Sequence, residues 1–182
     1  TKGHILIGDG SGNPRMLAVG DDAEVLTADS GETTGVKWGA LAVTDISCYV
    51  YKSGAQSINN GAQTALTFDT ELFDTDTIHS GASPTRLTAT QGGLYVVTAT
   101  MAFASNGTGR RYMVIKLGGA TNVSTGEVDT NQSGSHRQCI VTLIRLSATN
   151  YLELEVYQTS GGALNALASR EECSFGMARI AA

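Results

Sequence analysis

Turn-forming residues divide this chain into short apolar segments. Clusters of Gly, Asp, Asn and Ser return about every 8–12 residues, which is the spacing typical of sandwiches and barrels. The chain has 182 residues, of which 22 are glycine, against an average share of about 7%. No segment carries a convincing amphipathic helical period, since the best candidate, 163–168, is short and follows two glycines. We therefore expect many short strands joined by tight turns.

The charge of the chain excludes several classes of protein. Only 16% of the residues are charged and the net charge is −5, so a nucleic acid partner bound through a basic surface is not expected. No apolar run approaches the ~20 residues that span a bilayer, and no basic region precedes an apolar stretch at the N-terminus. We expect neither membrane insertion nor a secretory signal.

The sequence changes character near residue 40. Before it, short apolar pieces such as 4–7, 15–19 and 23–27 alternate with turn residues. An isolated hairpin of this size is marginal in water, because it cannot bury its apolar side. We therefore predict that residues 1–44 form a β-rich stalk or connector, in which the strands of several chains close around a shared axis.

Residues 45–182 read as one all-β domain. The run 151–157 alternates cleanly, so Leu152, Leu154 and Val156 are expected to face the core while Glu153 and Glu155 face solvent. The segments 104–110, 118–136 and 158–172 are expected to be long loops. The other predicted strands are 94–103, 111–117, 139–146 and 173–180.

Four short motifs in this second part occur in a recognisable order. Together they match the V-x-F-D element, the G-x-Y-x-F strand, the L-x-x-G-D-x-V-x-L strand pair and the closing F-x-G-x-L-L strand of C1q/TNF-like head domains. Residues 46–182 thus resemble that family, although the family's Gly-Asp turn is Thr149-Asn150 here. The motifs are Leu-Thr-Phe-Asp at 66–69, Gly-Gly-Leu-Tyr-Val-Val at 92–97, residues 146–154, and Ser-Phe-Gly-Met-Ala-Arg-Ile at 174–180.

The N-terminal part carries a second resemblance. Residues 2–3, 8–10, 25–30 and 34–38 match a segment common in the tail fibres of tailed bacteriophages and in related virion attachment proteins. The two resemblances together imply a homotrimeric fibre tip, in which an intertwined β stalk carries jelly-roll heads. They also imply a place in the virion tail, assembly in the host cytoplasm, and contact with other tail or baseplate proteins.

The strand 94–103 is apolar on both faces, which suits contact with a neighbouring subunit as well as with a partner sheet. We predict that Tyr95, Val97, Met101 and Phe103 lie at the trimer interface; the alternative is that both faces line the core of one chain. Trp38, the only tryptophan, is also predicted to lie at the trimer interface, where it is expected to join the stalk to the head; the alternative is a ligand platform.

No catalytic motif is present, so we expect neither an enzyme nor a cofactor. His4, His79 and His136 stand in Gly/Ser-rich or stalk settings and are expected to be solvated. The acidic run 69–76 lacks the spacing of a Ca²⁺ loop and is expected to be a solvated loop. Cys48, Cys139 and Cys173 are widely spaced and lack a C-x-x-C pattern, so we expect buried thiols and no metal.

Recognition is expected in the loops of the head, because binding residues concentrate on loops of rigid scaffolds. Amide and aromatic side chains suit saccharides, and the arginines could meet anionic sugars. The low overall charge favours neutral polar contacts. The candidate binding residues are Asn106, Arg110, Asn122, Asn131, Gln132, His136 and Tyr157.

The hypothesis that follows is a non-catalytic attachment protein that binds a bacterial surface glycan or protein. Three alternatives stay open at this point. The trimer could be a structural connector or decoration piece that docks another virion protein, it could be a C1q-like adhesin of non-viral origin, or it could be a small glycanase.

Overall fold

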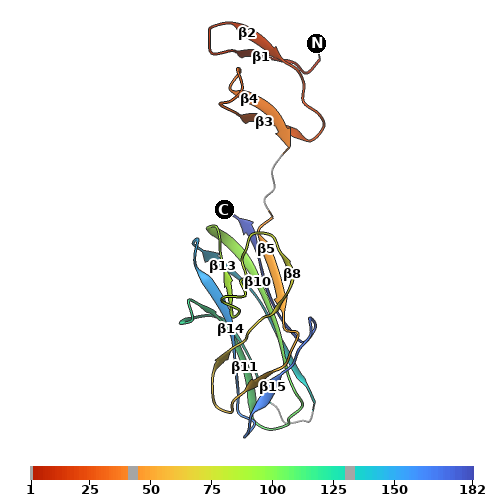
Figure 1. Ribbon diagram of the computed structural model, residues 1–182, viewed down its shortest axis with the longest axis vertical. Coiled ribbons are helices and arrows are strands. Elements are labelled where there is room, and N and C mark those ends of the chain that lie inside the picture. The colour runs from red at the N-terminus through yellow and green to blue at the C-terminus, as the bar shows by residue number, and fades with distance from the viewer. Residues whose placement is uncertain (1, 41–44, 130–133) are drawn as a thin grey trace. The chain divides into compact units, whose positions relative to one another are not determined.

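The computed structural model describes residues 2–40, 45–129 and 134–182 (Figure 1). The chain divides into two compact units, Thr1–Thr44 and Asp45–Ala182. Every regular element in the described ranges is a β-strand. These ranges hold no helix that is long and apolar enough to cross a membrane.

The N-terminal unit consists of two antiparallel hairpins. The first pairs β1 (Ile5–Gly8) with β2 (Pro14–Leu17), and the second pairs β3 (Glu24–Ala28) with β4 (Val36–Ala40). The Asp9 carboxylate closes the first turn by accepting hydrogen bonds from the backbone N–H groups of Ser11 and Asn13, at 2.9 and 3.1 Å. Those bonds hold the pKa of Asp9 below its usual value. Several apolar side chains of this unit stay exposed, namely Leu6, Met16, Val19, Val25 and Leu26.

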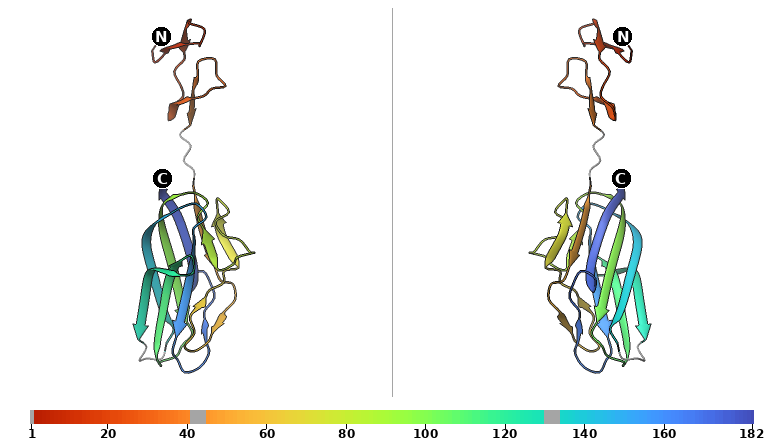
Figure 2. Two further views of the ribbon diagram at one scale, coloured as in Figure 1. Left: turned by 90° about the vertical axis from the view of Figure 1, so that its left-hand side faces the viewer. Right: turned by 90° about the vertical axis from the view of Figure 1, so that its right-hand side faces the viewer.

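The head is a sandwich of two mainly antiparallel sheets. The larger, seven-stranded sheet is built around the long strands β10 and β16, and β13 pairs along the free side of β10. These three strands lie side by side in the right-hand view of Figure 2. In spatial order the path runs β6 (Gln56–Ile58), β15 (Leu164–Ala166), β10 (Gly93–Phe103), β16 (Cys173–Ala181), β5 (Ser47–Tyr51) and β8 (Thr70–Asp74), with β13 (His136–Leu146) beside β10.

The second sheet has five strands. Its centre is the pair β11 and β14, which are far apart in the sequence and antiparallel in the sheet. The path runs β12 (Thr121–Asp129), β11 (Arg110–Leu117), β14 (Tyr151–Gln158) and β7 (Thr64–Ala65), with β9 (Arg86–Thr88) also paired to β14.

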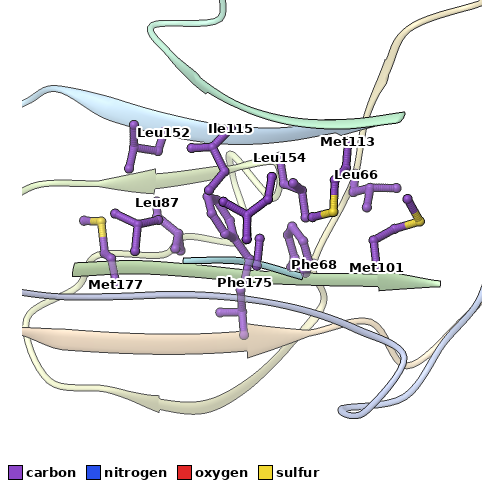
Figure 3. Packing of buried hydrophobic residues seen from close by; sticks show 14 of the residues in the cluster. Leu66, Phe68, Leu87, Met101, Met113, Ile115, Leu152, Leu154, Phe175 and Met177 are labelled. Atoms are coloured by element: carbon purple, nitrogen blue, oxygen red, sulfur yellow. The ribbon is translucent and has the colours of Figure 1, made fainter. Parts of the chain in front are cut away.

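The core lies between the two sheets (Figure 3). Met101 and Phe175 reach it from the larger sheet, and Met113 and Leu154 reach it from the smaller one. The aromatic rings of Phe68 and Phe175 lie 5.7 Å apart between their centroids. Strand alternation produces this layer, since every second side chain points to the same face of a strand.

Several sequence predictions for the head are confirmed. Leu152, Leu154 and Val156 are fully buried, as their alternation predicted. The expectation that Glu153 faces solvent is wrong, since Glu153 is buried, and its carboxylate accepts hydrogen bonds from Thr85 and Arg86 that offset the cost of burial.

Three of the expected loops are wrong where the structure places strands. Within 118–136, nine residues form β12, and within 158–172 three residues form β15. The acidic run 69–76 contains β8, which pairs with β5. Both β12 and β8 are sheet-edge strands with many polar residues, so the apolar alternation that marks a strand was missing there.

Candidate functional site

The outward face of the larger sheet carries an apolar patch. Val141 and Leu143 of β13 are 70% and 59% exposed, and they stand opposite Thr98 and Val96 of β10. Ile180 near the end of β16 is also exposed. We call these residues, together with the groove described next, the assembly face. Large exposed apolar side chains on one sheet face are typical of an interaction site.

A shallow groove of about 160 Å³ lies on the same face, above Gly176 of β16. Tyr49 closes one side, where its ring stacks on Phe73 at 6.2 Å between centroids and its hydroxyl donates to Ser174 at 2.8 Å. A Cβ on Gly176 would come within 2.7 Å of the Tyr49 ring, so the groove depends on glycine at that position. The opposite wall is formed by Val96 and Thr98.

The residues predicted for the trimer interface lie on the other face of β10. Tyr95, Val97, Met101 and Phe103 are fully buried in the core of the single chain, so that prediction is wrong. Both faces of β10 are apolar, but only the face with Leu94 and its even-numbered neighbours points away from the second sheet.

A polar pocket of about 460 Å³ opens on the outward face of the smaller sheet. Its floor follows one row across three strands, because Tyr112 of β11 stands directly opposite Glu127 of β12 and Tyr157 of β14. Gln63, which immediately precedes β7, extends the row at the far side of Tyr157. Arg110 is the fifth lining residue. We call this the tyrosine pocket.

The Arg110 side chain interacts with two other residues of the tyrosine pocket, Glu127 and Tyr157. Its guanidinium donates to the Glu127 carboxylate at 2.9 Å and lies 5.5 Å from the centroid of the Tyr157 ring. The nearby Glu127 carboxylate raises the pKa of Arg110. Arg110 and Tyr157 were predicted as binding residues, and the structure brings these two together.

Arg111 points the opposite way and orders the neighbouring loop. Its side chain is fully buried, and its guanidinium donates to the backbone oxygens of Asn106, Thr108 and Arg110 at 2.9 to 3.1 Å. Desolvation lowers the pKa of this arginine. The amide of Asn106 accepts from the N–H of Thr108, so its side chain serves the turn of the loop.

The remaining predicted binding residues do not join the pocket. Asn122 lies at the opposite end of β12 from Glu127, beside Lys116. His136 begins β13, opposite Phe103 in the larger sheet. Asn131 and Gln132 lie outside the described residues. The loops therefore contribute less to this site than the faces of β11, β12 and β14.

Sequence reasoning missed Tyr112, Glu127 and Gln63. A usable signal was present in β11, since Arg110 and Tyr112 are two residues apart and therefore point to one face of the strand. The sequence predicts a strand at Tyr112 but not the face to which its side chain points, and it predicts a loop at Glu127, which lies in β12.

His79 is a buried residue, contrary to the solvated position expected for it. Its Nδ1 lies 2.8 Å from the Glu71 carboxylate, and its backbone N–H donates to Asp74 at 2.8 Å. Burial, with nearby Asp74, raises the pKa of the Cys48 thiol to about 12, so the sulfur stays protonated and is no nucleophile. Among the described residues no cluster of His, Cys, Asp or Glu has the makings of a metal site.

The other two cysteines differ from each other. Cys173 is buried beside Lys52, and its pKa is also raised to about 12, mainly by desolvation. Cys139 is exposed on the assembly face, so the prediction of a buried thiol is wrong at this position. Its partner across the strands is Thr100 of β10.

Trp38 joins the two hairpins of the N-terminal unit. Its indole N–H donates to the backbone oxygen of Ala18 at 2.7 Å. Gly20 lies against the ring so closely that a Cβ would come within 2.7 Å of it. These contacts give Trp38 a role inside that unit.

The head matches solved structures in fold, and no protein-family model and no curated protein matches the sequence. Eiger TNF from S. frugiperda is similar with a TM-score of 0.60 at 12% identity, covering 76% of this chain and 94% of that chain. Murine APRIL, crystallised at pH 5.0 and at pH 8.0, is similar with TM-scores of 0.61 and 0.59 at 8% and 9% identity. Each APRIL match covers 75% of this chain and 99% of the other.

The head has the TNF-like jelly-roll fold. This confirms the fold that the sequence motifs implied for residues 46–182. In the TNF-like head, the assembly face and the tyrosine pocket lie on opposite sheets of one sandwich.

Proposed function

We propose that this chain is a non-catalytic, homotrimeric attachment protein, the distal part of a phage tail fibre, whose TNF-like head binds a bacterial surface glycan or protein. One observation carries the proposal: the apolar assembly face and the polar tyrosine pocket lie on opposite sheets. An assembly through the first face leaves the second free to meet a receptor.

The assembly face supports self-association. Burying a large apolar side chain contributes about 1.5–3 kcal/mol relative to leaving it exposed, and Val141, Leu143 and Ile180 are all exposed in the single chain. The N-terminal unit also exposes apolar side chains that association would bury, since Leu6 and Met16 are more than half exposed. Association of identical chains in a closed ring is a common way to bury such residues.

The place in a virion tail is supported by the N-terminal sequence block, which resembles the segment found in phage tail fibres. Free thiols at Cys48, Cys139 and Cys173 agree with assembly in the reducing cytoplasm of a host cell. Other tail or baseplate proteins are the partners that this location implies.

Binding without catalysis is supported by the chemistry of the tyrosine pocket. Glycosidases use two carboxyl groups on either side of the scissile bond. The residues that line this pocket include one carboxylate, Glu127, and it is engaged by Arg110 at 2.9 Å. The pocket therefore offers groups that can hydrogen-bond a saccharide, and it lacks the pair of carboxyl groups on which most glycosidases rely.

Two measurements test the proposal. One chain has a mass of 18.9 kDa. Light scattering on the purified protein is expected to give three times that mass. The soluble trimer is expected to compete with the parent phage for adsorption to host cells. A monomer, or a trimer that leaves adsorption unchanged, contradicts the proposal, and the second result favours a connector that docks another virion protein.

A further inference from the structure

The tyrosine pocket has no net charge, although two of its five lining residues are charged. Arg110 and Glu127 neutralise each other at 2.9 Å, and Gln63, Tyr112 and Tyr157 are neutral. An anionic ligand would be attracted by the Arg110 guanidinium, but it would also be repelled by the Glu127 carboxylate within the same site. That carboxylate opposes acidic sugars, since like charges at close range repel.

The same pair suits neighbouring hydroxyl groups. A carboxylate accepts hydrogen bonds and a guanidinium has five N–H donors, of which Glu127 occupies one through Nη1. Two adjacent hydroxyls of one sugar can therefore donate to Glu127 and accept from Arg110. The exposed fractions of these side chains, 43% and 51%, leave both accessible to a ligand.

The tyrosines complete a saccharide site. Tyr112 and Tyr157 stand opposite each other on adjacent strands, where side chains are about 4.5–5.5 Å apart at Cβ. They combine an apolar ring with a polar hydroxyl, and the amide of Gln63 offers both a donor and an acceptor. A volume of about 460 Å³ falls within the range of small-molecule pockets, roughly 300–1,000 Å³.

We infer that the tyrosine pocket binds an uncharged saccharide unit with adjacent hydroxyl groups, held between Glu127, Arg110 and the Tyr112–Tyr157 pair. The inference rests on the proposed attachment function and specifies where the receptor binds and of which chemical class it is. It moves the recognition site from the loops, where sequence reasoning placed it, to the face of the smaller sheet.

The test compares the wild-type trimer with two pocket variants, Glu127→Gln and Tyr157→Ala. The probe is an array of purified bacterial polysaccharides, some neutral and some bearing uronate or sialate groups. Wild type is expected to bind neutral members, and each variant is expected to lose at least tenfold in affinity for them. The matched control is Glu155→Gln, which removes a carboxylate from another ion pair of the same sheet, that with Lys116 at 3.0 Å. This control is expected to bind like wild type.

The sign of the Glu127→Gln effect distinguishes the two sugar classes. An acidic-sugar site would bind more tightly once the competing carboxylate is gone, and that result would overturn the inference. Variants that bind as tightly as wild type would also overturn it, and would place the receptor site elsewhere on the head. If wild type itself fails to compete for host cells, the proposed function fails instead. Thermal melting of each variant shows that it is folded.

Discussion

Arg110 and Arg111 are neighbours in the sequence and meet opposite environments. The pleat of β11 sends Arg110 outward to Glu127 and sends Arg111 inward, where three backbone oxygens accept from its guanidinium. Burying a charge is costly unless its donors are satisfied. The hydrogen bonds from Nη1 and Nη2 of Arg111 offset much of this cost, although its buried Nε has no hydrogen-bond partner in the described part of the chain.

Replacing Arg111 by Met is therefore expected to lower the free energy of unfolding by about 2–4 kcal/mol, since buried backbone acceptors lose their donors. Arg110→Met is the matched control, and is expected to change it by no more than about 0.5 kcal/mol because Arg110 is exposed. Denaturant titration at one protomer concentration measures both. Equal losses in the two variants would contradict this assignment.

Gly109, which precedes these arginines, has no room for a side chain. Its φ is +73°, and a Cβ there would come within 1.8 Å of the backbone oxygen of Thr159. Gly109→Ala is expected to cost about 3 kcal/mol or more, since the backbone itself must shift. The control is Gly161→Ala, at φ +89° with open space around it, which is expected to cost about 1 kcal/mol. Thermal unfolding compares the two, and a similar cost at both positions would contradict the steric argument.

Among the strands, β13 places several apolar side chains on the outward face of the larger sheet. Its inward side chains include Ile140 and Leu146 in the core, while Val141, Leu143 and Cys139 point out. A strand in a single-chain sandwich ordinarily turns polar residues to solvent. The exposed apolar row of β13 is the element-level sign of a partner surface.

If the chain is the trimer proposed above, the double variant Val141→Arg, Leu143→Arg is expected to be a folded monomer. Both side chains are exposed in the single chain, so the core is untouched, whereas two charges per chain would be desolvated at the interface. Light scattering gives the mass and circular dichroism checks the strands. Thr125→Arg on the exposed face of β12 is the charge control and should remain trimeric. A double variant that stays trimeric would place the interface elsewhere.

At the scale of the whole molecule, buried titratable groups connect stability to pH. Cys48 and Cys173 have an ordinary thiol pKa of 9.0 that burial raises to about 12. Between these values the unfolded chain loses protons that the folded chain keeps, so stability falls as pH rises. Burial lowers the pKa of Lys52, and this group acts in the opposite direction until its usual value of 10.5 is reached.

We therefore expect stability to fall as pH rises above 9, by at most about 1.4 kcal/mol per pH unit for each thiol, with Lys52 offsetting part of this loss below pH 10.5. The double variant Cys48→Ala, Cys173→Ala is expected to flatten this slope, whatever its effect on stability at neutral pH. Denaturant titrations from pH 8 to pH 11 measure the slope, and an unchanged slope in the double variant would contradict the assignment.

Long apolar strands could be predicted closely from the sequence, and polar edge strands could not. The run 94–103 differs from β10 by one residue at its start, because apolar residues on both sides of a strand leave few alternatives. β12 was missed since its residues, from Thr121 to Asp129, are largely polar and exposed. Such a strand is held by its pairing with β11, which is a contact outside its own segment.

The pattern of apolar residues and turns is enough to predict an all-β chain, the position of most core strands, and the side of 151–157 that faces the core. The buried face of β10 depends on tertiary contacts, since both faces are apolar and the alternation of side chains along a strand does not say on which side the second sheet lies. The tertiary structure also decided that Tyr112, Glu127 and Tyr157 share one row. These residues come from three strands, and only long-range register brings their side chains together.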